Sequence, residues 1–299
     1  MKYGLLALFL VLIGCASSSS KIQKAYGQPV VTKFSKNWRS HYLVGTIHLP
    51  LDVEKMYPQL LPMIDESSAF VSEINFKVTD SLVMKQIESQ RNYYAKGEGS
   101  LKNDLSPEAY AWVSEQLSDF SDKTFATLKP VRAWTLIQEK YKDAVEDAQK
   151  KLAEPADEAP IEGIYIHKDR TIYDAQLEAY ARSKNKKIVA LETGKESVLQ
   201  KCFQLQAIFS LENVTYTLKK SPTSQPADDA LKKYKSCLLA ERNREWIQTL
   251  KPLLEKEDKV FIAVGMAHLY SKQDKANSLI TLLEGEGYKV QIVSPEPNR

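Results

Sequence analysis

The chain has 299 residues, of which 43% are hydrophobic and 26% charged, a composition typical of globular proteins with a buried core. The formal net charge is only +3 at pH 7, and this balance gives no support to nucleic-acid binding. Beyond the first residues, no stretch of the sequence is apolar enough to span a membrane.

The amino terminus has the pattern of a secretion signal followed by a lipid-attachment site. Lys2 precedes an apolar run, Gly4–Ile13, which is too short for a stable membrane anchor and fits the core of a signal peptide. The run ends in Leu-Ile-Gly-Cys15, which resembles a bacterial lipobox and implies cleavage before Cys15 and acylation of its sulfur. An ordinary signal peptide that contains a cysteine is the alternative interpretation.

The expected parts of the chain are a signal peptide at residues 1–14, the lipidated cysteine with a flexible tether at residues 15–28, and one domain at residues 29–299. Ala16 follows the cysteine in place of an aspartate, which in enteric-type bacteria favours the outer membrane. We therefore expect a protein that is anchored in the lipid bilayer of the bacterial cell envelope and faces the periplasm.

Strands and helices are predicted to alternate at both ends of this domain, around a helical insertion at about residues 80–160. Period-two patterns and short apolar runs predict strands at Val30–Phe34, His41–Thr46, Ala69–Ile74, Lys187–Leu191, Lys259–Gly265 and Lys289–Val293. Helical spacing and start signals predict helices at Val53–Ile64, from Pro107, from Pro130, and at Ile172–Ser183, Ser197–Phe209, Asp228–Leu254 and Ser278–Leu283. The pattern indicates an α/β fold with some α+β character, in which a mostly parallel central sheet carries an inserted helical layer.

Proteins with an open parallel sheet usually bind their ligands beyond the carboxyl ends of the strands. The polar residues that follow each strand are therefore the first candidates for a ligand-binding or catalytic site. These residues are His48, Glu73, Glu192 and His268. Both histidines close a Gly-x-x-His motif, at Gly45–His48 and Gly265–His268. A glycine at this place allows a tight turn and a close approach of the backbone to a ligand.

Two imidazoles and a carboxylate suit a divalent transition metal. His48, Glu73 and His268 are therefore expected to bind manganese, cobalt or zinc and to leave a coordination position open for catalysis. The alternative is that each histidine is a hydrogen-bonded structural residue.

The remaining histidines and cysteines have other expected roles. His41 lies at the opposite end of its strand from the cleft and is expected to be structural, and His167 is expected at the surface. Cys202 and Cys237 form an even pair once Cys15 is acylated, so a disulfide is expected in an oxidising compartment. Two buried free thiols are the alternative.

Several segments carry a resemblance to a known family. They are Tyr42–Leu49 with Gly-Thr-x-His, Val71–Glu73, Leu128–Pro130, Asp174–Ala181, Leu191–Thr193, Glu241–Trp246 with Arg-Asn-x-x-Trp, and Ala263–Leu269 with Gly-x-x-His-Leu. In this order they resemble the TraB/GumN family, whose relatives include the TIKI proteases and, more remotely, erythromycin esterase-like proteins. The chain departs from the family pattern at Leu49-Pro50, at Val131, around Ile161–Arg170 and at Tyr173. These departures could reshape the wall of a substrate site.

The resemblance implies that the two Gly-x-x-His motifs and a glutamate form a metalloprotease centre supported by manganese or cobalt. On this chain the centre comprises His48, Glu73 and His268, with Glu73 either a metal ligand or the general base. Arg242 becomes a candidate catalytic cation for a developing oxyanion or a substrate carboxylate. Alternatively, Arg242 is an ion-pair partner of Glu73 or Glu192.

Three further residues have roles suggested by the same resemblance. Glu192 and Asn243 are candidates for orienting a metal-binding histidine. Alternatively, the Glu192 carboxylate only lies near a helix N-terminus, where the helix dipole stabilises its negative charge. Trp246 is expected to pack in the core rather than to stack on a substrate.

Two classes of function fit these features best. The first is a metal-dependent hydrolase that cleaves a peptide or ester bond of a peptide or small-molecule substrate, with metal-bound water as the nucleophile. The second is a lipoprotein that binds haem or another small ligand without catalysis, as a remote relative does, with Met266 as a soft contact. A scaffold that merely retains the motifs is a third reading.

Overall fold

The computed structural model describes residues 30–47, 53–74, 92–95, 97–142, 172–192, 198–219, 224–270 and 275–293. The expected signal peptide at 1–14, the tether at 15–28 with Cys15, and the histidines His48 and His167 lie outside these ranges. No helix of the described part is both long enough and apolar enough to cross a membrane.

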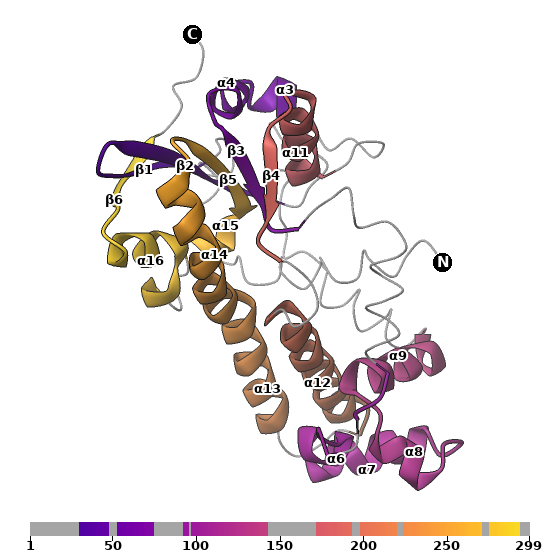
Figure 1. Cartoon of the computed structure of the whole chain (residues 1–299). Helices are drawn as coiled ribbons and strands as arrows, with labels where there is room; N and C mark the ends of the chain where they lie inside the picture. Colours follow the sequence, from indigo (N-terminus) through magenta and orange to yellow (C-terminus); the bar gives the residue numbers. More distant parts are fainter. Residues whose placement is uncertain are drawn as a thin grey trace, which may run out of the picture. The chain divides into compact units, whose positions relative to one another are not determined.

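The chain divides into two compact units (Figure 1). The sheet unit consists of the described residues within Met1–Phe76, Leu152–Thr193 and Asn243–Arg299, and the helical unit of those within Lys77–Lys151 and Gly194–Arg242. The helical unit therefore contains a second chain segment in addition to the insertion expected at about residues 80–160.

The sheet unit is built on a six-stranded sheet with the order β4-β3-β5-β2-β1-β6. The strands are β1 (Val30–Lys36), β2 (Arg39–Thr46), β3 (Ala69–Ser72), β4 (Lys187–Ala190), β5 (Val260–Gly265) and β6 (Lys289–Val293). β4, β3, β5 and β2 are parallel neighbours, whereas β1 is antiparallel to both β2 and β6. This confirms the expected α/β fold with a mostly parallel sheet and a helical layer.

Helices of the sheet unit bury both faces of the sheet. They are α3 (Val53–Met56), α4 (Leu60–Asp65), α11 (Tyr173–Ser183), α14 (Arg242–Lys256, of which Arg242 belongs to the helical unit), α15 (Met266–Leu269), the 3-10 turn η3 (Lys275–Asn277) and α16 (Leu279–Gly285). Ile262 and Val264 of β5 join the core beside α14 and α16, and Phe261 and Ala263 join the core beside α4 and α11. All six residues of β5 are buried, which explains the uninterrupted apolar run in its sequence.

The helical unit has its own core. Its helices are α6 (Leu101–Asp104), α7 (Pro107–Gln116), α8 (Asp122–Ala126), α9 (Pro130–Lys140), α12 (Val198–Lys219), α13 (Gln225–Ser236) and the π-helical turn η2 (Cys237–Glu241). Ser106 caps α7 as expected, since its side chain accepts a hydrogen bond from the Ala109 amide. Buried side chains from α6 to α9 pack with Leu211 of α12.

Three predicted helices differ from the structure. The helix expected at Val53–Ile64 is wrong as a single element, because the chain interrupts it before α4, at a segment that contains Pro58. The helix expected at Ser197–Phe209 extends to Lys219. The helix expected at Asp228–Leu254 begins earlier, ends later, and contains the π-helical turn η2.

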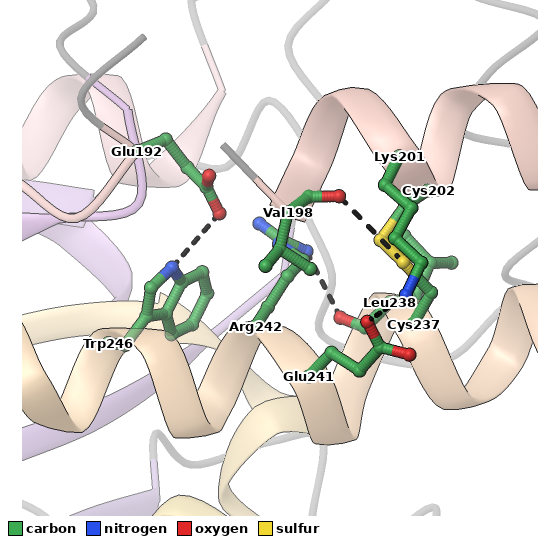
Figure 2. Close-up of a disulfide and its surroundings, with 9 residues drawn as sticks. All are labelled: Glu192, Val198, Lys201, Cys202, Cys237, Leu238, Glu241, Arg242 and Trp246. Carbon is green, nitrogen blue, oxygen red and sulfur yellow. Dashed lines mark hydrogen bonds and ion pairs between the residues drawn. A yellow bond between two sulfur atoms is a disulfide. The ribbon is translucent and has the colours of Figure 1, made fainter. Parts of the chain in front are cut away.

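A disulfide joins two buried cysteines of the helical unit (Figure 2). Cys202 lies in α12, and Cys237 is the first residue of η2. Their Cα atoms are 5.4 Å apart, within the usual range for a disulfide. The bond closes a sequence separation of 35 residues, so it restricts the unfolded chain and stabilises the contact between α12 and η2.

His41 is a fully buried histidine in β2, close to the amino end of β5. The Val260 amide donates a hydrogen bond to its Nδ1 at 3.2 Å, and its ring lies against those of Phe34 and Tyr288. Burial, and secondarily the positive charge of Arg39, lower the pKa of His41 from 6.5 to about 4. A second proton on this ring would face the Val260 N–H, so the folded state favours neutral imidazole.

This pKa difference predicts an acid-dependent loss of stability. Between about pH 6.5 and pH 4 the unfolded chain binds a proton at His41 that the folded chain does not bind. The free energy of unfolding should therefore fall by about 3 kcal/mol as the pH decreases through this window. The variant His41→Asn, whose amide oxygen can accept the Val260 bond, should lack this contribution in urea unfolding at pH 4 to 8. Equal pH slopes for both proteins would contradict the prediction.

Candidate functional site

The carboxyl ends of the parallel strands lie along one edge of the sheet. The registers that align them are Thr46 with Gly265, Ser72 with Ala263, and Ser72 with Ala190. Glu73, Glu192 and His268 follow these aligned ends along the chain. His48, the other residue expected at this edge, lies outside the described residues.

Glu73 and His268 are brought together at this edge, and both are buried. Glu73 Oε1 accepts a hydrogen bond from the Gly265 amide at 2.6 Å. The same oxygen lies 4.0 Å from His268 Nε2, which is too far for a direct hydrogen bond. Carboxylate oxygens and imidazole nitrogens are ligands that divalent transition metals bind.

Asn243 of α14 determines how His268 is oriented. Its Nδ2 donates to the carbonyl oxygens of His268 at 3.1 Å and Asn277 at 2.8 Å. Because both of these partners can only accept, the amide nitrogen must face them and Oδ1 must face the ring. His268 Nδ1 lies 2.7 Å from Oδ1 and is therefore the nitrogen that donates. The lone pair of the neutral ring is then on Nε2, the nitrogen on the side of Glu73.

Trp246 connects His268 to Glu192. The two rings lie 4.3 Å apart between centroids at an angle of 36°, and the indole Nε1–H donates to Glu192 Oε1 at 2.9 Å (Figure 2). Trp246 is fully buried, in agreement with the expected core position, and it also forms one wall around His268. Glu192 thus binds the indole of Trp246, which in turn packs against the ring of His268.

Gly45 has a packing role that differs from the expected turn. Neither Gly45 nor Gly265 has a positive φ angle, so neither is required for a left-handed conformation. A Cβ at Gly45 would instead lie 2.7 Å from both Sδ and Cε of Met266. The Met266 side chain of α15 thus approaches Gly45 closely, where an approach to a ligand was expected, and the glycine allows α15 to pack on β2.

Arg242 belongs to the helical unit, at the first position of α14. Its guanidinium is buried and donates a hydrogen bond to the Leu238 carbonyl at 3.3 Å (Figure 2). Its expected role as a cation for a developing oxyanion stays a prediction.

Two buried carboxylates of α11 lie at the same edge of the sheet and were not singled out from the sequence. Asp174 accepts a hydrogen bond from Thr46, the last residue of β2, and Glu178 accepts one from Ser72, the last residue of β3, at 2.9 Å. The available signal was a pair of acidic residues one helical turn apart on the face that α11 buries.

The described part of the sheet edge supplies fewer ligands than a catalytic metal site usually has. Within the ranges that the structure describes, no three His, Cys, Asp or Glu side chains are grouped to hold an ion. The described part of the edge supplies two donors, the Nε2 lone pair of His268 and the Glu73 carboxylate. Their chemistry fits manganese, cobalt or zinc, for which a catalytic site usually takes three protein ligands.

Replacing Asn243 by alanine tests its control of His268. The change removes Asn243 as a partner of the His268 and Asn277 carbonyls and of the His268 N–H, so the free energy of unfolding should fall by about 2–4 kcal/mol. Long-range ¹H–¹⁵N spectra should show the Nδ1–H tautomer of His268 in the parent protein and a tautomer mixture in the variant. The exposed Asn103→Ala is the control. An unchanged tautomer in Asn243→Ala would refute the assigned role.

The chain matches the family model described as the TraB/PrgY/gumN family over residues 30–292. No curated protein and no solved structure gives a match. The matched range begins with the first residue of β1 and ends within β6, so it covers all strands of the sheet and the edge that holds Glu73 and His268. The chain therefore belongs to the TraB/PrgY/gumN family.

Proposed function

We propose that the protein is a metal-dependent hydrolase that cleaves a peptide or ester bond, with His48, Glu73 and His268 as the metal ligands. The observation that carries this proposal is the pairing at the sheet edge, where Asn243 directs the Nε2 lone pair of His268 to the side on which Glu73 Oε1 lies 4.0 Å away. Thr46, two residues before His48, pairs with Gly265, which supports His48 as the third donor.

The proposed chemistry assigns a task to each residue. A bound manganese, cobalt or zinc ion would lower the pKa of a water molecule and polarise the carbonyl of the scissile bond. His268 supplies the ring nitrogen Nε2, whose orientation is preset by the contact of Nδ1 with Asn243. Glu73 acts either as a ligand or as the general base, and its bond to the Gly265 amide holds the carboxylate in place for one of these roles. Arg242 would stabilise negative charge that develops on the substrate.

The proposed location is the cell envelope. Cys15 would carry the lipid that anchors the chain in the outer membrane, with the domain in the periplasm. The Leu-Ile-Gly-Cys15 sequence supports acylation, and the disulfide between Cys202 and Cys237 is compatible with an oxidising compartment. Metabolic labelling with a palmitate analogue should modify the parent chain and leave Cys15→Ala unlabelled.

Metal binding and cleavage test the catalytic proposal together. Purified protein should bind about one transition-metal ion per chain, and His48→Ala/His268→Ala should lose it. Cleavage of a peptide and ester library should require manganese, cobalt or zinc, and Glu73→Gln should lower its rate at least about 100-fold, the size typical of a lost general base. His167→Ala is the matched histidine control.

Two results would reject the hydrolase. One is the absence of cleavage with every ion tested, and the other is a Soret band on addition of haem without any metal-dependent turnover. The second result would favour the alternative, a lipoprotein that binds haem or a small ligand. In the structure the Met266 side chain packs over Gly45, which supports a packing role for this methionine.

A further inference from the structure

Two acidic residues of α11 are buried on one face of this helix. Asp174 is 2% exposed and Glu178 is 1% exposed, and they lie one helical turn apart. Around them α11 packs with apolar side chains such as Leu177 and Phe70. Burying carboxylates costs free energy that a pair of apolar residues would not cost, so their presence here requires another explanation.

Glu178 is bound on both of its oxygens. Oε1 accepts from Arg182 Nε at 3.0 Å and from Arg182 Nη2 at 2.8 Å, and Oε2 lies 2.9 Å from Ser72 Oγ. Ser72 Oγ also lies 2.8 Å from the Ile74 carbonyl. A serine hydroxyl carries one hydrogen and both of these neighbours are acceptors, so Ser72 shares its hydrogen between Glu178 and the Ile74 carbonyl. Glu178 thus ties the last residue of β3 to α11.

Asp174 makes the equivalent contact at the end of β2, which lies on the other side of β5 from β3. Its carboxylate accepts the hydroxyl hydrogen of Thr46, two residues before His48. Both hydroxyl residues are the last of their strands, and both precede a proposed metal ligand. One helix thus holds the ends of the two strands that lead into Glu73 and His48.

A second set of bonds continues from Glu73. Its carboxylate accepts the Gly265 amide of β5, and its Oε1 lies on the Nε2 side of His268. A shift of the Ser72–Ile74 turn would therefore break the bond to Gly265 and change the distance between Glu73 and His268. The chain of contacts runs from Arg182 through Glu178, Ser72 and Glu73 to Gly265.

We propose that Glu178 and Asp174 are positioning residues, which clamp the carboxyl ends of β3 and β2 through Ser72 and Thr46, on both sides of β5, and so place Glu73 against Gly265 and His268. The consequence for metal binding rests on the proposed function. The placement of Glu73 against Gly265 is a property of the metal-free protein, so it can be measured separately.

Hydrogen exchange of the Gly265 amide measures this placement directly, because Glu73 is its hydrogen-bond acceptor. In metal-free full-length protein, Glu178→Leu and Ser72→Ala should speed its exchange at least about tenfold more than that of Ile262, within the same strand. Glu178→Gln, which keeps an acceptor for Ser72, should restore part of the protection. Glu178→Leu should lower the melting temperature, because it removes the carboxylate that pairs with the Arg182 charge, so the comparison of Gly265 with Ile262 is what isolates the local effect.

Cobalt binding measures the consequence for the metal site. Glu178→Leu and Asp174→Leu should weaken Co²⁺ affinity by about 10- to 100-fold, as loss of supporting contacts usually does. Glu212→Gln is the control, since Glu212 is another buried glutamate that accepts a serine hydroxyl, that of Ser106 in the helical unit. It should leave Co²⁺ affinity within about twofold.

The outcomes separate the two proposals. Equal changes at Gly265 and Ile262 in Glu178→Leu and Ser72→Ala would overturn the positioning role, whatever the metal does. Selective exposure of Gly265 in a protein that binds no Co²⁺ would support the positioning role and reject the metal site. A selective change at Gly265 with unchanged Co²⁺ affinity would limit the role to Glu73 and remove its link to the metal.

Discussion

The parallel pairing of β2, β5 and β3 is the constraint on which the candidate site depends. Parallel neighbours end at the same edge, so the residues that follow them can meet only there. Cores on both faces of the sheet hold the register, because a shift by one residue would turn apolar side chains of one core toward the other. The close approach of Met266 to Gly45 adds a contact at the edge itself.

Hydrogen bonds to the backbone make this edge a preorganised site. Glu73 is held by the Gly265 amide, and Asn243 is held by two carbonyl oxygens while it accepts from His268. Backbone groups in regular structure move little, so side chains bound to them keep their orientation. This arrangement supports the proposed hydrolase, and the buried carboxylates of α11 extend it to the strand ends on the opposite face of the sheet.

Several elements could be predicted because their signals are local. The strand expected at Lys259–Gly265 is β5 within one residue, since a strand buried on both faces reads as an unbroken apolar run. The start of α7 was found from Ser106 and Pro107. The end of α12 was not predicted, because the sequence carries no local signal for it. Contacts with α9 and α13 stabilise this helix as far as Lys219. The break before α4 was missed because the apolar pattern continues through Pro58.

The sequence by itself determined the α/β fold, the family motifs and the residue types of the candidate site, because each depends on neighbouring residues and their periodicity. Only the tertiary structure decided that Asn243 holds His268 and that Trp246 links this ring to Glu192. It also decided that Asp174 and Glu178 reach Thr46 and Ser72. These contacts join residues far apart in the chain, and their geometry is set by how helices pack on the sheet, which no local pattern encodes.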